Sequence, residues 1–326
     1  MKFISIFTKQ YVKAVLALLL ISNVAFAAYP DKPIRIIVNY PPGGSTDIIG
    51  RFMGVRLSDA LKVPVLVENK GGASGMIGAT YVVKSPNDGY TILHTASGPQ
   101  AINVSLFKDI PYDPIKDFSP IILTSVPPLL MVVNASHPAN NVTEFITWAK
   151  ENKGRVNFCS IGPGTPSHLA GELFQTMAGI EMTHIPYKGS GPAIIDMISG
   201  QCSVLFDSAL SSGPHVKGGK LKALGIGSKT RVASWPNVPT ITESGLPGYE
   251  AYTWTALVAP AGTPKDVIEK LNKEAGKIIA SPEYKELLNS QGALPGGGSA
   301  TDLQNFTKSE IQKWGKIIRD GNIKPD

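Results

Sequence analysis

The sequence lacks the short motifs that usually identify an enzyme. It has no Walker loop, no Cys-x-x-Cys and no His-Glu-x-x-His, and in Gly72-Ala73-Ser74-Gly75 the second glycine comes one residue too early for a nucleophile elbow. Ser167 and His168 are adjacent, and neighbouring side chains at a helix start diverge, so a catalytic dyad is not expected. The five histidines lack the spacing of metal ligands: His94, His137, His168, His184 and His215. We therefore expect no catalysis, no metal and no cofactor.

Long apolar runs are also missing. The run at residues 14–21 is too short for a permanent membrane helix, and no later segment approaches about 18 apolar residues. Three lysines precede that run, and Ala25-Phe26-Ala27 follows it, which is the layout of a secretory signal peptide. We expect cleavage after Ala27 and a periplasmic mature protein. A membrane-anchored form is the alternative.

The expected mature chain has only a small net positive charge. The full chain carries +6, and residues 1–27 hold three lysines and no acids, which leaves +3 (6 − 3). That balance gives little reason to expect a nucleic-acid partner. The remaining 299 residues (326 − 27) are enough for a large core or for two domains of ordinary size.

Cysteine is scarce, with only Cys159 and Cys202. An exported chain permits a disulfide, but each cysteine lies in an apolar run where small buried residues are expected. If Cys159 lies just before the end of one strand and Cys202 begins a parallel neighbour, they are offset by roughly 13 Å, which is too far to bridge. This interpretation favours two unpaired buried thiols and leaves the disulfide as the alternative.

Short apolar strands alternate with helical segments along the first third of the chain. Strands are predicted at 34–38, 63–68 and 90–95, and glycine- or serine-rich turns follow them at 43–47, 71–75 and 96–98. This repetition predicts a mostly parallel sheet flanked by helices. All three turns would then lie at the carboxyl edge, where ligands bind in such sheets.

The pattern restarts after a run at 121–133 that Pro127 and Pro128 interrupt. Strands are predicted at 156–160, 182–186, 202–206 and 221–226, and the turn at 162–168 opens a helix in the same way as the first turn. A strand at 253–259 and helices at 265–280, 283–290 and 301–320 complete the chain.

Two of the turns are suited to holding an anion. Gly43-Gly44 allows a tight turn, and Ser45, Thr46 and Asp47 are residue types that cap a helix N-terminus. Free backbone N–H groups beside the positive end of a helix dipole can bind a carboxylate without an arginine. An ordinary capped turn without a ligand is the alternative.

These patterns predict an α/β protein of two lobes, each a mostly parallel sheet with helices, and a ligand cleft between them. Beyond the signal peptide at 1–27, we assign 28–128 and 253–326 to the first lobe and 129–252 to the second. The chain would cross between lobes twice, near Pro127-Pro128 and near Tyr252. Hinge closure around a ligand is typical of extracytoplasmic binding proteins.

Several motifs, in this order, resemble one family. They are Tyr-Pro-Pro-Gly-Gly-Ser-Thr-Asp at 40–47, Glu-Asn-Lys at 68–70, Gly-Pro-Gly-Thr-Pro-Ser-His-Leu at 162–169, His-Ile-Pro-Tyr-Lys-Gly at 184–189 and Phe-Asp-Ser at 206–208. Together they resemble the Bug (TctC) family of periplasmic solute-binding proteins, with a two-lobed, type II-like fold. The resemblance implies that the two glycine turns hold one ligand carboxylate largely through ordered waters, and that membrane permease subunits of a tripartite tricarboxylate transporter are the partners.

The resemblance and the residue types together define a candidate site. Backbone or hydroxyl donors to the carboxylate are expected from the two turns, and a wall from the neighbouring strand ends. Asp47 is a helix cap or a ligand contact, His168 a donor to the ligand or to its own loop, and Asp207 a partner for a ligand ammonium or hydroxyl or a structural group. Tyr40 and Trp254 are candidates to pack on the ligand or to lie in the core. The full set is Tyr40, Gly43, Gly44, Ser45, Thr46, Asp47, Ala73, Ser74, Thr95, Ser97, Ser160, Gly164, Thr165, Ser167, His168, Asp207 and Trp254.

The ligand's identity stays open at this point. Dicarboxylates, tricarboxylates, amino acids and aromatic acids all offer one carboxylate. We expect a monomer that delivers such a solute to a transporter. A sensor that presents the solute to a membrane receptor kinase is the alternative function, because it would use the same cleft.

Overall fold

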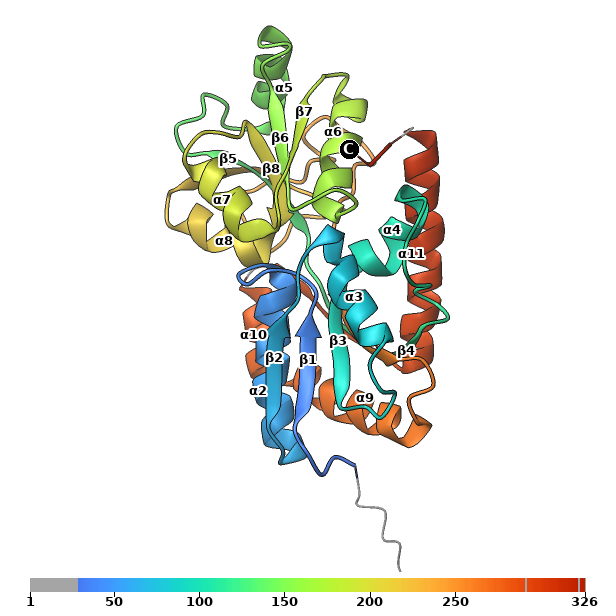
Figure 1. Ribbon diagram of the computed structural model, residues 1–326. Helices are drawn as coiled ribbons and strands as arrows, with labels where there is room; N and C mark the ends of the chain where they lie inside the picture. Colours follow the sequence, from blue (N-terminus) through green and yellow to red (C-terminus); the bar gives the residue numbers. More distant parts are fainter. Residues whose placement is uncertain (1–28, 291, 322, 326) are drawn as a thin grey trace, which may run out of the picture.

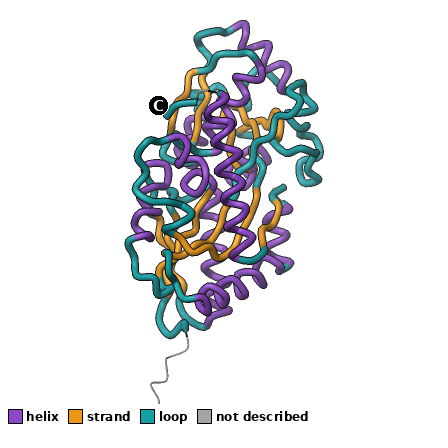
Figure 2. The backbone as a smooth tube through the Cα atoms, turned by 90° about the vertical axis from the view of Figure 1, so that its right-hand side faces the viewer, coloured by secondary structure: helices purple, strands orange, loops and turns teal. Residues whose placement is uncertain are grey.

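Two separate β-sheets organise the chain, one in the lower and one in the upper part of the molecule (Figures 1 and 2). The computed structural model describes residues 29–290, 292–321 and 323–325. The predicted signal peptide and its cleavage site lie outside the described residues. Within the described part of the chain, no helix is both long and apolar enough to cross a membrane.

The first sheet has six strands in the order β11-β4-β10-β3-β1-β2. β1 pairs in parallel with β2 and β3, whereas β10 is antiparallel to β3 and β4, and β11 is antiparallel to β4. The bounds are β1 Ile34–Val38, β2 Val65–Asn69, β3 Thr91–Ala96, β4 Phe118–Val126, β10 Thr255–Pro260 and β11 Leu294–Gly297. The three predicted turns therefore follow adjacent strands at one edge, as expected.

Helices cover both faces of the first sheet. The side chains of β1 point alternately to one face and to the other, so they enter two different cores. Ile34, Ile36 and Val38 pack with residues of α2 Ser45–Leu61, α9 Lys265–Ala280 and α10 Pro282–Asn289. Ile37 faces the other way, into a core shared with α3 Met76–Val83 and α11 Ala300–Asp320. Three short helical turns complete this part: η1 Ala73–Gly75, η2 Gly98–Ile102 and α4 Asn103–Leu106. We call this unit the first lobe.

The second sheet has five strands in the order β7-β6-β8-β5-β9. β6 is parallel to β7 and β8, and β5 is antiparallel to β8 and β9. The elements are β5 Leu129–Asn134, α5 Val142–Glu151, β6 Asn157–Ser160, α6 Pro166–Ala178, β7 Thr183–Pro186, α7 Ser190–Ile198, β8 Val204–Ser208, α8 Ala209–Lys217 and β9 Leu221–Ile226. One core lies under α5 and α6 and a second core under α7 and α8. We call this unit the second lobe.

Both sheets are mixed rather than mostly parallel. The strands that leave or re-enter a lobe, namely β4, β5 and β10, run antiparallel to their neighbours. A strand that arrives from the other lobe enters the sheet from the cleft side, so its direction is opposite to that of a strand that ends at the cleft. The α/β class and the two-lobed arrangement predicted from the sequence are confirmed.

The two crossings between lobes lie side by side. Thr253 N donates to Pro127 O (3.0 Å) and Leu129 N donates to Ala251 O (3.1 Å), which makes a short two-stranded ribbon. The proposed lobe boundaries at 128/129 and 252/253 both fall within this ribbon. These two paired segments are the backbone connections between the lobes.

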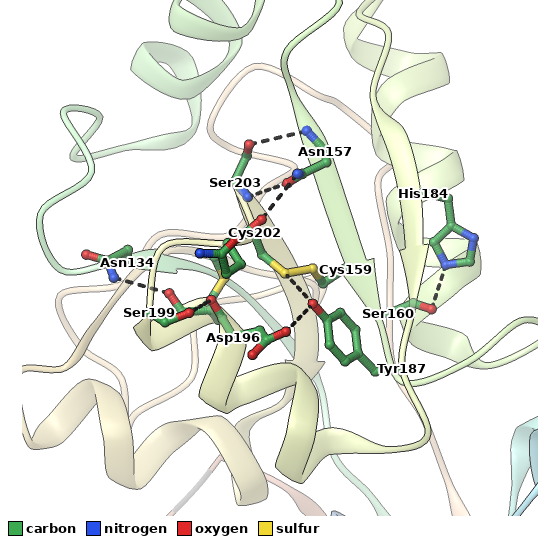
Figure 3. Close-up of a disulfide and its surroundings, with 12 residues drawn as sticks. Asn134, Asn157, Cys159, Ser160, His184, Tyr187, Asp196, Ser199, Cys202 and Ser203 are labelled. Carbon is green, nitrogen blue, oxygen red and sulfur yellow. Dashed lines mark hydrogen bonds between the residues drawn. A yellow bond between two sulfur atoms is a disulfide. The ribbon is translucent and has the colours of Figure 1, made fainter.

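Cys159 and Cys202 form a disulfide with a Cα–Cα distance of 6.0 Å, so the prediction of unpaired thiols was wrong (Figure 3). β8 begins at Val204 rather than at Cys202. Ser203 N donates to Asn157 Oδ1 (2.7 Å) and Asn157 N donates to Ser203 Oγ (3.2 Å), which fastens the segment before β8 against β6. The chain therefore bends toward Cys159, and the offset expected for two straight strands does not apply.

Candidate functional site

A small cavity lies between the lobes where the carboxyl ends of their strands meet. Its volume is about 20 Å³, which is room for one or two water molecules. A ligand of several carbon atoms can enter only if the lobes separate. The lining residues come from both lobes and from the ribbon: Tyr40, Ser45, Thr46, Ala96, Leu129, Ile161, Pro166, Ser167, Asp207, Ser208 and Thr253.

Three helices begin at this cavity: α2, α6 and α8, the last at Ala209 after its cap Ser208, a lining residue. α2 begins at Ser45 after Gly44, which has no side chain to cap the helix, so the first amides of α2 need other partners. α6 begins at Pro166 after Thr165, in the turn of the second lobe. The N-terminal ends of all three helices favour negative charge.

Two buried hydroxyls in the lining, Tyr40 Oη and Ser167 Oγ, have no hydrogen-bond partner among the described residues. Burial raises the pKa of Tyr40, so its hydroxyl stays neutral and can donate. A buried hydroxyl without a partner is costly, and such groups in a cavity are expected to bind a ligand or its waters.

The first turn is held rigid by Asp47. Its carboxylate accepts hydrogen bonds from Gly43 N (3.0 Å) and Asn69 Nδ2 (2.8 Å) and lies 2.9 Å from Arg51 Nε. Burial acts to raise the pKa of Asp47, but these hydrogen bonds and the Arg51 charge outweigh it and leave the pKa below its usual value. Asp47 is thus fully engaged within the first lobe, as a cap would be.

His94 is hydrogen-bonded to the backbone of the same turn. It is fully buried, its Nδ1 donates to Thr46 O (2.8 Å), and its Nε2 lies 3.0 Å from Thr124 Oγ1. Burial lowers the pKa of His94 to about 4, so the ring is neutral at pH 7. The start of α2 is therefore fixed by neutral hydrogen bonds and by Asp47, which leaves Ser45 and Thr46 at the cavity.

The glycine conformations differ from the expectation in one respect. Gly43 has a φ of +90°, which favours glycine, whereas Gly44 has an ordinary φ of −85°. A Cβ at Gly44 would lie 3.4 Å from Ser190 Oγ of the second lobe, which is an ordinary van der Waals contact, so neither φ nor space requires glycine there. The two lobes approach each other closely at this position.

Asp207 is the carboxylate in the cavity lining, and three serines surround it. Its oxygens accept hydrogen bonds from Ser190 Oγ (2.9 Å), Ser211 Oγ (2.7 Å) and Ser212 Oγ (2.7 Å). The residue is 1% exposed, and this burial raises the pKa of Asp207 although the hydroxyls act to lower it. Asp207 therefore connects the start of α7 to the first turn of α8, and the residue also lines the cavity.

The second turn uses its polar groups internally. Thr165 Oγ1 donates to Gly162 O (2.7 Å) and accepts from His168 N (3.3 Å), and Gly164 N donates to His168 Nδ1 (3.3 Å). His168 stacks on His184 at 4.2 Å, and Ser160 Oγ lies 2.6 Å from His184 Nε2 (Figure 3). Of the two alternatives for His168, this geometry matches the contact with its own loop.

The other candidate residues lie around the cavity or away from it. Thr95 Oγ1 accepts from Asn39 Nδ2 (3.0 Å), and Ser97 Oγ lies 3.1 Å from Thr253 Oγ1, directly behind the lining. Ala73 is exposed, and Ser74 contacts the second lobe. Trp254 lies in the core of the first lobe, where its Nε1 donates to Glu310 Oε2 (2.9 Å).

Six lining residues were not among the predicted set: Ala96, Leu129, Ile161, Pro166, Ser208 and Thr253. Ser208 and Thr253 are next to the predicted residues Asp207 and Trp254, so their position at strand ends could have identified them. Leu129 and Ile161 are apolar, and nothing in their sequence context separates them from core residues.

The chemistry of the cavity is that of a binding site for an anion or a polar solute. Its lining contains no lysine or arginine, and it offers hydroxyls, helix N-termini and one shielded carboxylate. Across the described ranges, no group of three or more His, Cys, Asp or Glu side chains could hold a metal ion.

Comparisons with known proteins agree with this chemistry. Residues 49–323 match the family model TctC, described as the tripartite tricarboxylate transporter family receptor. The chain is 37% identical to Protein BugT of Bordetella pertussis over 91% of each chain. Among solved structures it resembles Rpa4515 of R. palustris, determined with adipate, at 34% identity and a TM-score of 0.89, covering 91% of this chain and 100% of that one. It also resembles MatC from Rhodopseudomonas palustris, determined with malate, at 29% identity and a TM-score of 0.85, covering 89% and 100%.

Proposed function

Because this chain belongs to the TctC family of tripartite tricarboxylate transporter receptors, we propose that it captures a small carboxylate between its two lobes. The bound solute would be delivered to the membrane permease of such a transporter. We further propose that the mature protein is a periplasmic monomer and that it binds its solute without turnover.

One observation supports this proposal most directly. Tyr40 of the first lobe and Ser167 of the second, whose hydroxyls have no partner among the described residues, both line a cavity where α2 and α6 begin. A carboxylate or its first-shell waters would satisfy these donors and would lie at the positive ends of two helix dipoles. Without a cation in the lining, the charge would be held by amides and hydroxyls.

The neighbours suggest the size of the solute. The similar proteins were determined with adipate and with malate, which are aliphatic dicarboxylates. The two glycine turns together can bind one carboxylate, so the second carboxylate of the ligand would extend toward the rest of the cleft. We propose a dicarboxylate of four to six carbons as the first class to test.

Thermal unfolding and calorimetry with malate, adipate and the uncharged adipamide test this proposal. We expect saturable stabilisation by a dicarboxylate, about 2.7 kcal/mol at 100 times its dissociation constant, and none by adipamide. Affinity should change little between low and moderate salt because no ion pair forms. If no carboxylate stabilises the protein, and native mass spectrometry finds no co-purifying acid, the proposed function is wrong.

A further inference from the structure

Ser74 connects the lobes instead of facing the cavity. It belongs to the turn after β2 in the first lobe, and its Oγ donates a hydrogen bond to the carbonyl oxygen of Pro163 in the second lobe. The two residues are 89 positions apart in the sequence. Ser74 is absent from the cavity lining.

The backbone around Ser74 is held in an unfavourable conformation. Gly72, Ala73, Ser74 and Gly75 all have positive φ, at 121°, 45°, 53° and 84°. Alanine and serine rarely adopt such angles, and strain of this kind persists only where the surroundings impose it. Here Asn39 Nδ2 donates to Gly75 O (3.1 Å), and a Cβ at Gly75 would lie 2.5 Å from Pro99. The packed turn therefore directs the Ser74 hydroxyl toward the second lobe.

The receiving segment is equally well fixed. Gly162 O accepts hydrogen bonds from both Thr165 N (3.3 Å) and Thr165 Oγ1 (2.7 Å), which fixes the turn. Gly164 N donates to His168 Nδ1 (3.3 Å), which orients the peptide that carries the Pro163 carbonyl. On its other side, a Cβ at Gly164 would lie 2.6 Å from Oδ1 of Asn103, a residue of the first lobe. Asn103 Nδ2 in turn donates to Ser74 O (3.2 Å). Ser74 thus bonds the turn of the second lobe, and Asn103 lies close against the same turn.

We propose that the Ser74–Pro163 hydrogen bond is a latch that stabilises the closed cleft whichever carboxylate is bound. The proposal rests on the function proposed above and assigns Ser74 a positioning role. Because both partners are outside the cavity, the latch contributes the same free energy for every ligand around which the lobes close far enough to form this contact. It slows release and leaves ligand selectivity unchanged.

Ser74→Asn and Ser74→Asp form a matched pair for testing the latch. Both side chains tolerate positive φ and have nearly the same shape, so the turn is preserved in each. The amide of asparagine can donate to the Pro163 carbonyl, whereas an ionised aspartate can only accept and is repelled by that oxygen. A third variant, Ser74→Gly, relieves the backbone strain and removes the hydroxyl.

Two readouts separate the latch from ligand contact. The first is the closed fraction without ligand, measured by fluorescence energy transfer between dyes on cysteines introduced at Val55 and Ile195, which are 61% and 67% exposed. The second is the dissociation rate of malate and of adipate. We expect Ser74→Asp to open the cleft and Ser74→Asn to keep it closed. Dissociation should accelerate about fivefold in Ser74→Asp, equivalent to about 1 kcal/mol, and by the same factor for both acids.

The closed fraction tests the latch even if neither acid binds, so failure of the proposed function would be seen separately. Equal closed fractions in Ser74→Asn and Ser74→Asp would overturn the latch. So would an effect confined to one of the two acids, because that result would place Ser74 in contact with the ligand. Urea unfolding of each variant shows that the fold is intact.

Discussion

Burial shifts the pH range over which the Asp207 carboxyl loses its proton. Its pKa is raised by burial, so the folded state holds the proton more tightly than the unfolded chain does. The favourable contribution of protonated Asp207 to stability is therefore complete below the ordinary pKa of about 4 and is lost as pH rises through the raised value.

We expect Asp207→Asn to remove this dependence. As pH rises from 4 to 7, the stability difference between the variant and the parent should move in favour of the variant. Urea unfolding at both pH values measures that difference. Ser211→Ala is the control, because it removes one hydroxyl that lowers the pKa and should extend the pH-dependent range upward. A difference that does not change with pH would contradict this account.

Thr165 and Ser167 look alike in the sequence but have different surroundings. Thr165 caps α6, so Thr165→Ala should lower the free energy of unfolding by about 1 kcal/mol. Ser167 Oγ has no partner in the described part of the structure, so Ser167→Ala should weaken carboxylate binding with little loss of stability. Urea unfolding and calorimetric titration of both variants check this contrast. A large stability loss in Ser167→Ala would show that its hydroxyl has a structural partner.

Five of the predicted residues line the cavity, namely Tyr40, Ser45, Thr46, Ser167 and Asp207, but the sequence did not predict what each one does there. The glycine turns identified Ser45, Thr46 and Ser167, and the position at the end of a strand identified Asp207, because ligands bind at the carboxyl ends of parallel strands. Whether a hydroxyl caps its own helix or faces the cavity depends on a side-chain rotation that residue type does not determine. Trp254 shows the same limit, since its place in the core depends on Glu310, 56 residues further along the chain.

At the scale of elements, β8 and its disulfide show what a local pattern misses. The apolar run was identified correctly, but its start was placed at Cys202, two residues before β8 begins at Val204. The bend before β8 comes from the exchange of hydrogen bonds between Asn157 and Ser203, which are 46 residues apart. Such a contact is invisible to any window of neighbouring residues.

Removing the disulfide should destabilise the second lobe. The bond closes a loop of 43 residues, and the loop-entropy estimate gives about 4 kcal/mol, an upper value since measured effects are often smaller. We expect the double variant Cys159→Ala/Cys202→Ala to unfold at lower urea concentration and to be unaffected by dithiothreitol, which should destabilise the parent. Parent and double variant with equal unfolding midpoints under non-reducing conditions would contradict this.

At the scale of the whole molecule, the ribbon between the lobes has two different faces. Leu129 and Thr253 line the small cavity, whereas their neighbours Pro128 and Tyr252 line a groove of about 950 Å³ on the other side. Successive residues of extended chain point to opposite faces, so the cavity and the groove lie on opposite sides of the ribbon. The groove is walled by residues 228–234 of the second lobe and by Leu294 and Phe306 of the first. Opening the cleft must therefore narrow the groove.

Filling the groove should favour the closed form. Ala233 is exposed and lines the groove. Ala233→Trp therefore introduces a large side chain between the two walls of the groove, which would approach each other when the cleft opens. We expect a few-fold lower dissociation constant for the carboxylate, because a larger closed fraction raises the apparent affinity. Calorimetric titration measures it, with Val55→Trp on the exposed side of α2 as the control. Weaker binding in Ala233→Trp alone would show that the groove widens on opening.

The position of β10 in the first sheet also determines the order in which the chain can fold. β10 lies between β3 and β4, although about 130 residues separate the end of β4 from its start, and the whole second lobe is made in that interval. A growing chain can complete the second sheet as soon as β9 is synthesised. The first sheet, whose β1 to β4 come earlier, has a gap at its centre until residues 255–260 appear. The part of the molecule synthesised first is therefore the last to fold, and it exposes unpaired strand edges until synthesis is nearly finished.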